Sequence, residues 1–114
     1  MATQPVDTRT RITDDLIQEV VQKIVRGFDP KRIIVFGSQA TGKTREDSDL
    51  DLFVEMDSEK RPVDRTVEMI EHIGPRFWAM DLFVLTPQEV AGQRGRGTLV
   101  DIVEEEGKVL YERE

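Results

Sequence analysis

The chain has 114 residues, of which 38% are hydrophobic and 34% are charged, as expected of one globular domain. Its formal net charge of -7 disfavours a protein that holds nucleic acid over a broad basic face, and the lack of cysteine with a single histidine excludes Cys/His zinc sites. No apolar run approaches the roughly 20 residues of a membrane span, and the first residues lack the apolar middle of a signal peptide. We therefore expect a cytoplasmic protein without a membrane partner.

The first segment, residues 1–12, is mostly polar and has no hydrophobic period, which predicts a flexible N-terminal arm before one domain over 13–114. A helix is expected next, because Thr13 can cap it and apolar residues then recur at helical spacing. Gly27 and Pro30 are expected to end this helix.

Two strands are predicted after this helix. Residues 33–36 are apolar without alternation, as in a central strand covered on both faces. After a polar loop over 38–48, the strand 49–55 alternates, which places Asp49 and Asp51 on one face. The opposite, apolar face consists of Leu50, Leu52 and Val54.

The sequence after residue 61 predicts three helices and two strands. The expected elements are a helix over 62–73, a strand over 78–85, a short helix opened by the capping box from Thr86 to Glu89, a helix over 99–106 and a strand over 109–111. Within the strand over 78–85, Asp81 and Phe83 share a face. Because the first two strands lie too close in the chain for a helical crossover, the order predicts a single mixed β-sheet flanked by helices, an α/β (α+β) fold.

Residues 37–44 read GSQATGKT, which also fits the G-x-x-x-x-G-K-[ST] pattern of a phosphate-binding P-loop after a strand. In a P-loop, however, the lysine and threonine open a long helix. Here Lys43 and Thr44 are followed within a few residues by the strand over 49–55, so there is no room for such a helix. The context therefore disfavours an ATPase of this class.

The longer segment over 37–52, GSQATGKTREDSDLDL, resembles the GSxAxG…SDxDL signature of the DNA-polymerase-β-like nucleotidyltransferase superfamily. It is most similar to the minimal nucleotidyltransferases, whose strand, Gly-Ser turn, Asp-x-Asp strand, helix and third acidic strand recur here in the same order. The resemblance implies the polymerase-β-like fold for nearly the whole domain. One departure is Gln39, where many minimal members have arginine. Lys43 or Arg45 would then supply the missing charge beside the triphosphate.

Three aspartates are candidate metal ligands. Residues two apart on a strand have Cα atoms about 6.5 to 7 Å apart on one face, so Asp49 and Asp51 can converge on two ions held about 3.5 to 4 Å apart. Asp81 joins them if its strand lies beside the strand over 49–55. Otherwise it is a solvated acid on the exposed part of an edge strand. An oxygen-only set of this kind suits Mg²⁺, with Mn²⁺ as the alternative.

The family resemblance implies attack of an acceptor hydroxyl on the α-phosphate of a nucleoside triphosphate, expected to be ATP, with release of pyrophosphate. Asp49 and Asp51 would bridge two Mg²⁺ ions, and Asp81 would bind one of them and favour deprotonation of the acceptor. Gly37 gives room for close approach of a ligand, and Ser38 offers its hydroxyl and amide to phosphate oxygens. The residues expected to bind the nucleotide are Gly37, Ser38, Gly42, Lys43, Arg45 and Ser48.

Three hypotheses remain for the partner of this chain and for what the chain does to it. Minimal members resembling this chain pair with a helical toxin-like protein of the HEPN type and act as antitoxins by transferring AMP to a toxin tyrosine. A small molecule such as an aminoglycoside is the enzymatic alternative, although relatives with that activity add a helical domain that completes the acceptor pocket. A module that neutralises its partner by docking alone, without catalysis, is the third.

Other conspicuous residues have structural interpretations. His72 is expected to be a solvated helical residue, and Trp78 a core or rim residue rather than a platform for a base. Arg94 and Arg96 lie among glycines, where they belong either to a solvated loop or to a contact with phosphate or an acidic partner.

Overall fold

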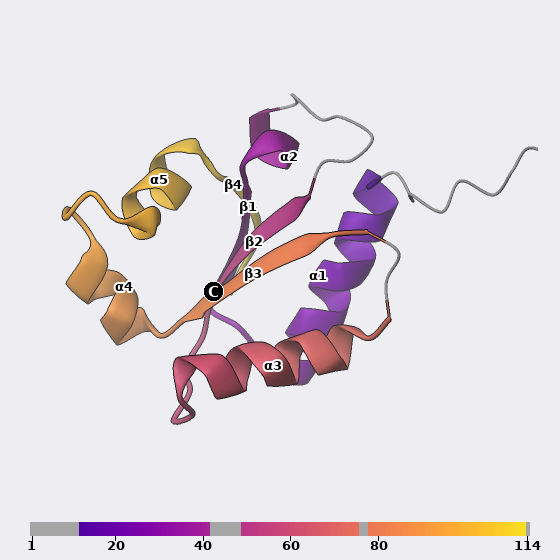
Figure 1. Ribbon diagram of the computed structural model, residues 1–114, viewed down its shortest axis with the longest axis horizontal. Coiled ribbons are helices and arrows are strands. Elements are labelled where there is room, and N and C mark those ends of the chain that lie inside the picture. Colours follow the sequence, from indigo (N-terminus) through magenta and orange to yellow (C-terminus); the bar gives the residue numbers. More distant parts are fainter. Residues whose placement is uncertain (1–11, 42–48, 76–77, 114) are drawn as a thin grey trace, which may run out of the picture.

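The computed structural model describes residues 12–41, 49–75 and 78–113, which form a four-stranded sheet with helices on both faces (Figure 1). The elements are α1 (Asp14–Phe28), β1 (Arg32–Phe36), α2 (Ser38–Thr41), β2 (Leu50–Glu55), α3 (Pro62–Ile73), β3 (Met80–Leu85), α4 (Pro87–Gln93), α5 (Leu99–Glu106) and β4 (Lys108–Glu112). Their order confirms the predicted one, apart from α2, for which the sequence predicts a loop. The amide of Ala40 donates to the carbonyl of Gly37 (N···O 3.1 Å), which closes this single turn.

The strands lie in the order β3-β2-β1-β4, with β1 antiparallel to both β2 and β4 and with β2 parallel to β3. The predicted mixed sheet is therefore confirmed. The parallel pair is joined through α3, because parallel neighbours need a crossover connection. Strand β2 thus lies between β1 and β3, and β3 forms one edge of the sheet in the described part of the chain.

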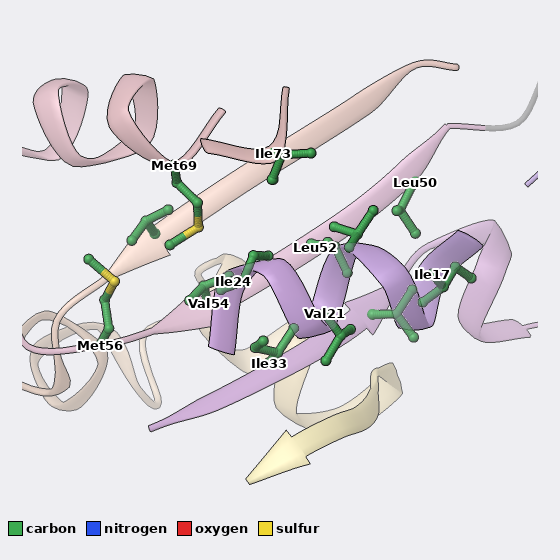
Figure 2. Packing of buried hydrophobic residues seen from close by; sticks show 13 residues of the cluster. Ile17, Val21, Ile24, Ile33, Leu50, Leu52, Val54, Met56, Met69 and Ile73 are labelled. Carbon is green, nitrogen blue, oxygen red and sulfur yellow. The ribbon is translucent and has the colours of Figure 1, made fainter. Parts of the chain in front are cut away.

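The alternation along β2 separates two hydrophobic clusters. Leu50, Leu52 and Val54 face α1 and α3, in the larger cluster shown in Figure 2. Phe53 faces the other way, onto residues of α4 and α5. Strand β1 contributes to both clusters, as its unalternating apolar sequence predicts. Asp51, one residue from Leu50 and two from Phe53, accordingly lies on the α4/α5 side of the sheet.

Helix α1 begins as predicted, since the hydroxyl of Thr13 accepts from the amide of Leu16 (3.2 Å). Its end differs from the prediction: Gly27 lies inside the helix, and Asp29 caps it in the left-handed conformation (φ 45°). The reason is tertiary, because a Cβ on Gly27 would lie only 2.5 Å from the ring nitrogen Nε2 of His72. Gly27 therefore lets α3 approach α1 closely.

His72 is exposed, yet it connects two helices. Its Nε2 lies 3.0 Å from the carbonyl oxygen of Lys23 in α1, and its ring meets the ring of Phe28 edge to face at 5.3 Å. The interpretation of His72 as a purely solvated residue is therefore incomplete. Among the helices of the described segments, none is long and apolar enough to cross a bilayer.

Candidate functional site

Asp51 and Asp81 lie side by side on neighbouring strands. Strand β3 pairs with β2 in parallel, and the register places Asp51 directly opposite Asp81 at the beginning of both strands. Asp51 is half-buried and Asp81 is exposed, and Asp81 acts directly on the carboxyl group of Asp51. The strand pairing on which the prediction for Asp81 depends is therefore present. Asp81 is also on an edge strand and exposed, as its alternative interpretation supposes.

The surroundings of Asp51 favour its protonated form. The pKa of Asp51 is raised to about 6, chiefly by burial and further by its interaction with Asp81 and by the charge of Asp49. Two carboxylates this close repel each other when both are ionised. A proton or a bound cation relieves that repulsion, so the pair is chemically suited to bind positive charge.

Gly37 lies against the carboxylate of Asp51. It follows β1 directly and has a φ of 70°, in the left-handed region that favours glycine, and a Cβ at this position would collide with Oδ2 of Asp51. The sequence predicts a close backbone approach at this glycine, and the group it approaches here is a carboxylate of the candidate site. Ser38 begins α2 immediately after it and is half-buried.

Asp49 lies just before β2 and is exposed. Its charge contributes to the raised pKa of Asp51, but within the described segments no three His, Asp or Glu side chains are arranged to hold a metal ion. The structure therefore brings Asp51 and Asp81 together and leaves Asp49 near them without completing a ligand set. The paired carboxylate oxygens are hard donors, which fits an oxygen-preferring divalent cation.

Four of the expected nucleotide-binding residues lie outside the described residues: Gly42, Lys43, Arg45 and Ser48. The bounds of the elements still bear on the P-loop alternative. Strand β2 begins at Leu50, so only residues 45–49 separate Thr44 from the strand. This is too short for the long helix of a P-loop.

Arg94 binds an acidic side chain of its own chain. Its Nε and a terminal nitrogen donate to the two carboxylate oxygens of Glu104 (2.8 and 2.7 Å). The amides of Gly95 and Gly97 donate to the carboxylate of Asp101 (2.7 Å each). The interpretation of Arg94 as a phosphate contact is therefore not supported, because its guanidinium and the glycine-rich turn are held by α5. Trp78 is half-buried against the larger cluster, as predicted.

Sequence reasoning missed Arg65, a buried arginine of α3. Its guanidinium donates to both carboxylate oxygens of Glu89 in α4 (2.6 and 3.0 Å), and its Nε is buried without a partner in the described chain. Together with the capping hydrogen bonds of Thr86, Arg65 lowers the pKa of Glu89 to about 2. The capping box was the available signal for Glu89, but no local pattern marks its partner.

Comparisons with known proteins agree with this geometry. A family model described as nucleotidyltransferase domain matches residues 15–113. A crystal structure of a Sulfolobus solfataricus protein, provisionally assigned as a nucleotidyltransferase, is similar in fold, with a TM-score of 0.61 and 22% identity over 87% of this chain and 79% of that chain. No curated protein sequence matches the chain significantly. The chain therefore belongs to the nucleotidyltransferase domain family, as its signature over 37–52 predicts, and has the polymerase-β-like fold of that superfamily.

Proposed function

We propose that this nucleotidyltransferase transfers AMP from ATP to a hydroxyl group of a protein acceptor, with Asp49, Asp51 and Asp81 as its metal ligands. The observation that carries the proposal is the register pairing of Asp51 with Asp81, with the backbone of Gly37 against one carboxylate. Two adjacent carboxylates repel each other unless a positive charge lies between them, and this makes them suitable ligands for a cation.

Bound Mg²⁺, expected as two ions with Mn²⁺ as the alternative, would neutralise the triphosphate and lower the pKa of the acceptor hydroxyl. The chain's own residues position the reactants. Gly37 and Ser38, at the turn into α2, would face the phosphates with backbone amides and a hydroxyl. Asp81 is the more exposed acid of the pair, so it is the one that an acceptor can reach.

The reaction balances without an oxidant or a covalent enzyme intermediate. The acceptor oxygen attacks the α-phosphorus, and an oxygen–phosphorus bond forms. The bond from the α-phosphorus to the oxygen that bridges it to the β-phosphate breaks, and pyrophosphate leaves with that oxygen. The hydroxyl proton passes to the carboxylate of Asp81.

For the acceptor we propose a tyrosine of a helical toxin-like protein of the HEPN type, with this chain as the antitoxin. Asp81 is exposed at the edge of the sheet, so a large acceptor can approach it. The net charge of -7 favours a basic partner by electrostatic attraction. A small molecule such as an aminoglycoside, and neutralisation by docking alone, are the competing functions.

Coexpression with a candidate helical partner, sought among the proteins encoded beside this one, separates transfer to a protein from docking alone. Intact mass spectrometry should find the partner heavier by roughly 329 Da per AMP when the wild type is present. Asp51→Asn should abolish this addition, whereas Asp57→Asn, the same change on an exposed acid beyond the far end of β2, should preserve it. A tight complex without added mass, and equal neutralisation by wild type and Asp51→Asn, would instead favour docking alone.

A further inference from the structure

Strand β3 is an edge strand that is more open than its neighbour. In β2 every residue except Asp51 is buried, whereas in β3 only Val84 is buried. Phe83 has 37% of its surface exposed although it packs against Phe36, with ring centroids 5.7 Å apart. Within the described segments no other strand pairs with the outer side of β3.

The backbone of β3 has hydrogen-bonding groups directed away from the sheet. The amide of Leu50 donates to the carbonyl of Ala79, and the amide of Met56 donates to the carbonyl of Leu85 (2.9 Å each). In a parallel pair alternate residues bond to the neighbouring strand, so the odd-numbered residues of β3 face β2. The amides and carbonyls of the even-numbered residues point outward, and in the described chain no backbone hydrogen bond from a loop or turn reaches them. These residues are Met80, Leu82 and Val84.

An apolar groove follows this edge. An open cavity of about 330 Å³ lies between the strand and the helices on both of its sides, and its lining is Pro62, Thr66, Leu82, Phe83, Val84, Leu85, Glu89, Gln93 and Leu99. A second hollow of about 260 Å³ shares Pro62 and Thr66 with the first and is completed by Val63 and Val67, which are 71% and 47% exposed. The one charged side chain in this lining is that of Glu89, which Arg65 already neutralises.

We propose that an extended segment of the protein acceptor adds to the β3 edge as a further strand and thereby presents its hydroxyl side chain to Asp81. This inference rests on the proposed function. Outward amides and carbonyls at every second residue match the backbone of an extended peptide. A second copy of the chain would bring another charge of -7 to the same edge, which disfavours it as the occupant.

The register determines which peptide residue meets the site. The residue that pairs with Asp81 directs its side chain to the same face as Asp81 and Asp51, with Cβ atoms about 4.5 to 5.5 Å apart across the pair. Its two neighbours point to the opposite face, toward Leu82 and the exposed valines of α3. The preferred segment therefore has a hydroxyl residue flanked by apolar residues, with basic residues farther out that complement the acidic pair.

A synthetic nonapeptide tests this pattern: lysine and valine alternate around a central tyrosine, so that lysines and tyrosine share one face. Amide hydrogen exchange of the full chain should be fast at Leu82 and Val84 and slow at Phe83 and Leu85, and the peptide should slow the two outward amides. A control peptide methylated on its alternate backbone nitrogens should leave them fast. No nucleotide is present, so docking is measured independently of transfer.

Two variants test the edge itself. Leu82→Pro removes the central outward donor, which an edge strand tolerates better than an inner strand, and should weaken peptide binding about tenfold. Phe83→Lys places a charge on the edge and should weaken it similarly. The matched change Val109→Lys, on the exposed opposite edge strand β4, should leave binding unchanged.

Equal binding of the methylated peptide, or equal loss in Val109→Lys, would overturn the proposal. Protection of the outward amides that grows with chain concentration and needs no peptide would also overturn it, in favour of a second copy. If the peptide protects the outward amides from exchange but no AMP is ever transferred, the docking site is supported and the proposed reaction is wrong. If transfer proceeds while the amides stay unprotected by a bound acceptor, docking on this edge is wrong.

Discussion

Substitution of Gly37 by alanine adds one carbon atom next to Asp51 and tests whether this contact matters for activity. Alanine at this position has the backbone cost of a positive φ, about 1 to 2 kcal/mol, and its Cβ also displaces the carboxylate of Asp51. Gly95→Ala is the matched control, because Gly95 has a φ of 80° and no atom within 4 Å of the added carbon. We expect both variants to lose stability in thermal melts, and only Gly37→Ala to lose nucleotidyl transfer. Equal transfer by the two would contradict the importance of this contact.

The glycines of two helices provide a second matched pair. In a helix interior, alanine is favoured over glycine by about 1 kcal/mol. At Gly92 the added carbon meets nothing within 4 Å, so Gly92→Ala should raise the melting temperature. At Gly27 the added carbon meets the ring of His72 and displaces this ring from the carbonyl of Lys23. Gly27→Ala should therefore lower the melting temperature. A higher melting temperature in both variants would show that the His72 contact contributes nothing measurable to stability.

At the scale of elements, the ion pair between α3 and α4 gives a pH dependence of known sign. Arg65 lowers the pKa of Glu89 from 4.5 to about 2, so folding favours the ionised carboxylate. This stabilisation is fully present above pH 4.5 and is lost as the pH falls from 4.5 towards 2. Urea unfolding should therefore show a steeper loss of stability over this range in the wild type than in Glu89→Gln. Parallel curves would contradict the assigned pair.

Local sequence pattern predicts the four strands, the four longer helices and the faces on which their residues lie. The two-residue period on β2 predicts that Asp51 lies opposite the leucines, and the same period on β3 predicts the face of Asp81. Their register pairing depends on a parallel strand contact through α3, which no local period specifies. The contacts of Arg65 with Glu89 and of His72 with Lys23 were missed for the same reason, since 24 and 49 residues separate the partners.

The one-turn helix α2 and the position of Asp49 mark another limit. A turn of four residues is too short to produce a helical period, so it cannot be told from a loop by pattern. The sequence predicts a strand that begins at Asp49, whereas β2 begins one residue later and Asp49 is exposed; its convergence with Asp51 on a metal ion stays a prediction. Alternation predicts the side of a sheet, and it does not predict where the strand begins.

For the whole molecule, charge predicts how nucleotide binds. The chain carries -7 and its candidate site is acidic, so ATP alone should be repelled. Calorimetry with Mg²⁺ should therefore detect ATP binding that excess chelator abolishes. Sodium chloride at matched ionic strength is the control, because it screens surface charge without supplying a ligand-bound cation. Equal affinity in chelator would contradict the assignment of the acids. Metal-free binding that Lys43→Ala weakens would revive the P-loop alternative.

The strand directions give the sheet two ends, which differ in how well they tolerate insertions in the chain. The end of β1 and the beginnings of β2 and β3 meet at one end of the sheet (Figure 1). Gly37, Asp51 and Asp81 lie together at this end. The chain leaves β2 and β3 at the opposite end, where residues 57–61 connect to α3 on an exposed path. Insertions between 57 and 61 would thus add a new recognition element at the end of the sheet opposite Asp51 and Asp81, beside the part of the groove that Pro62 lines.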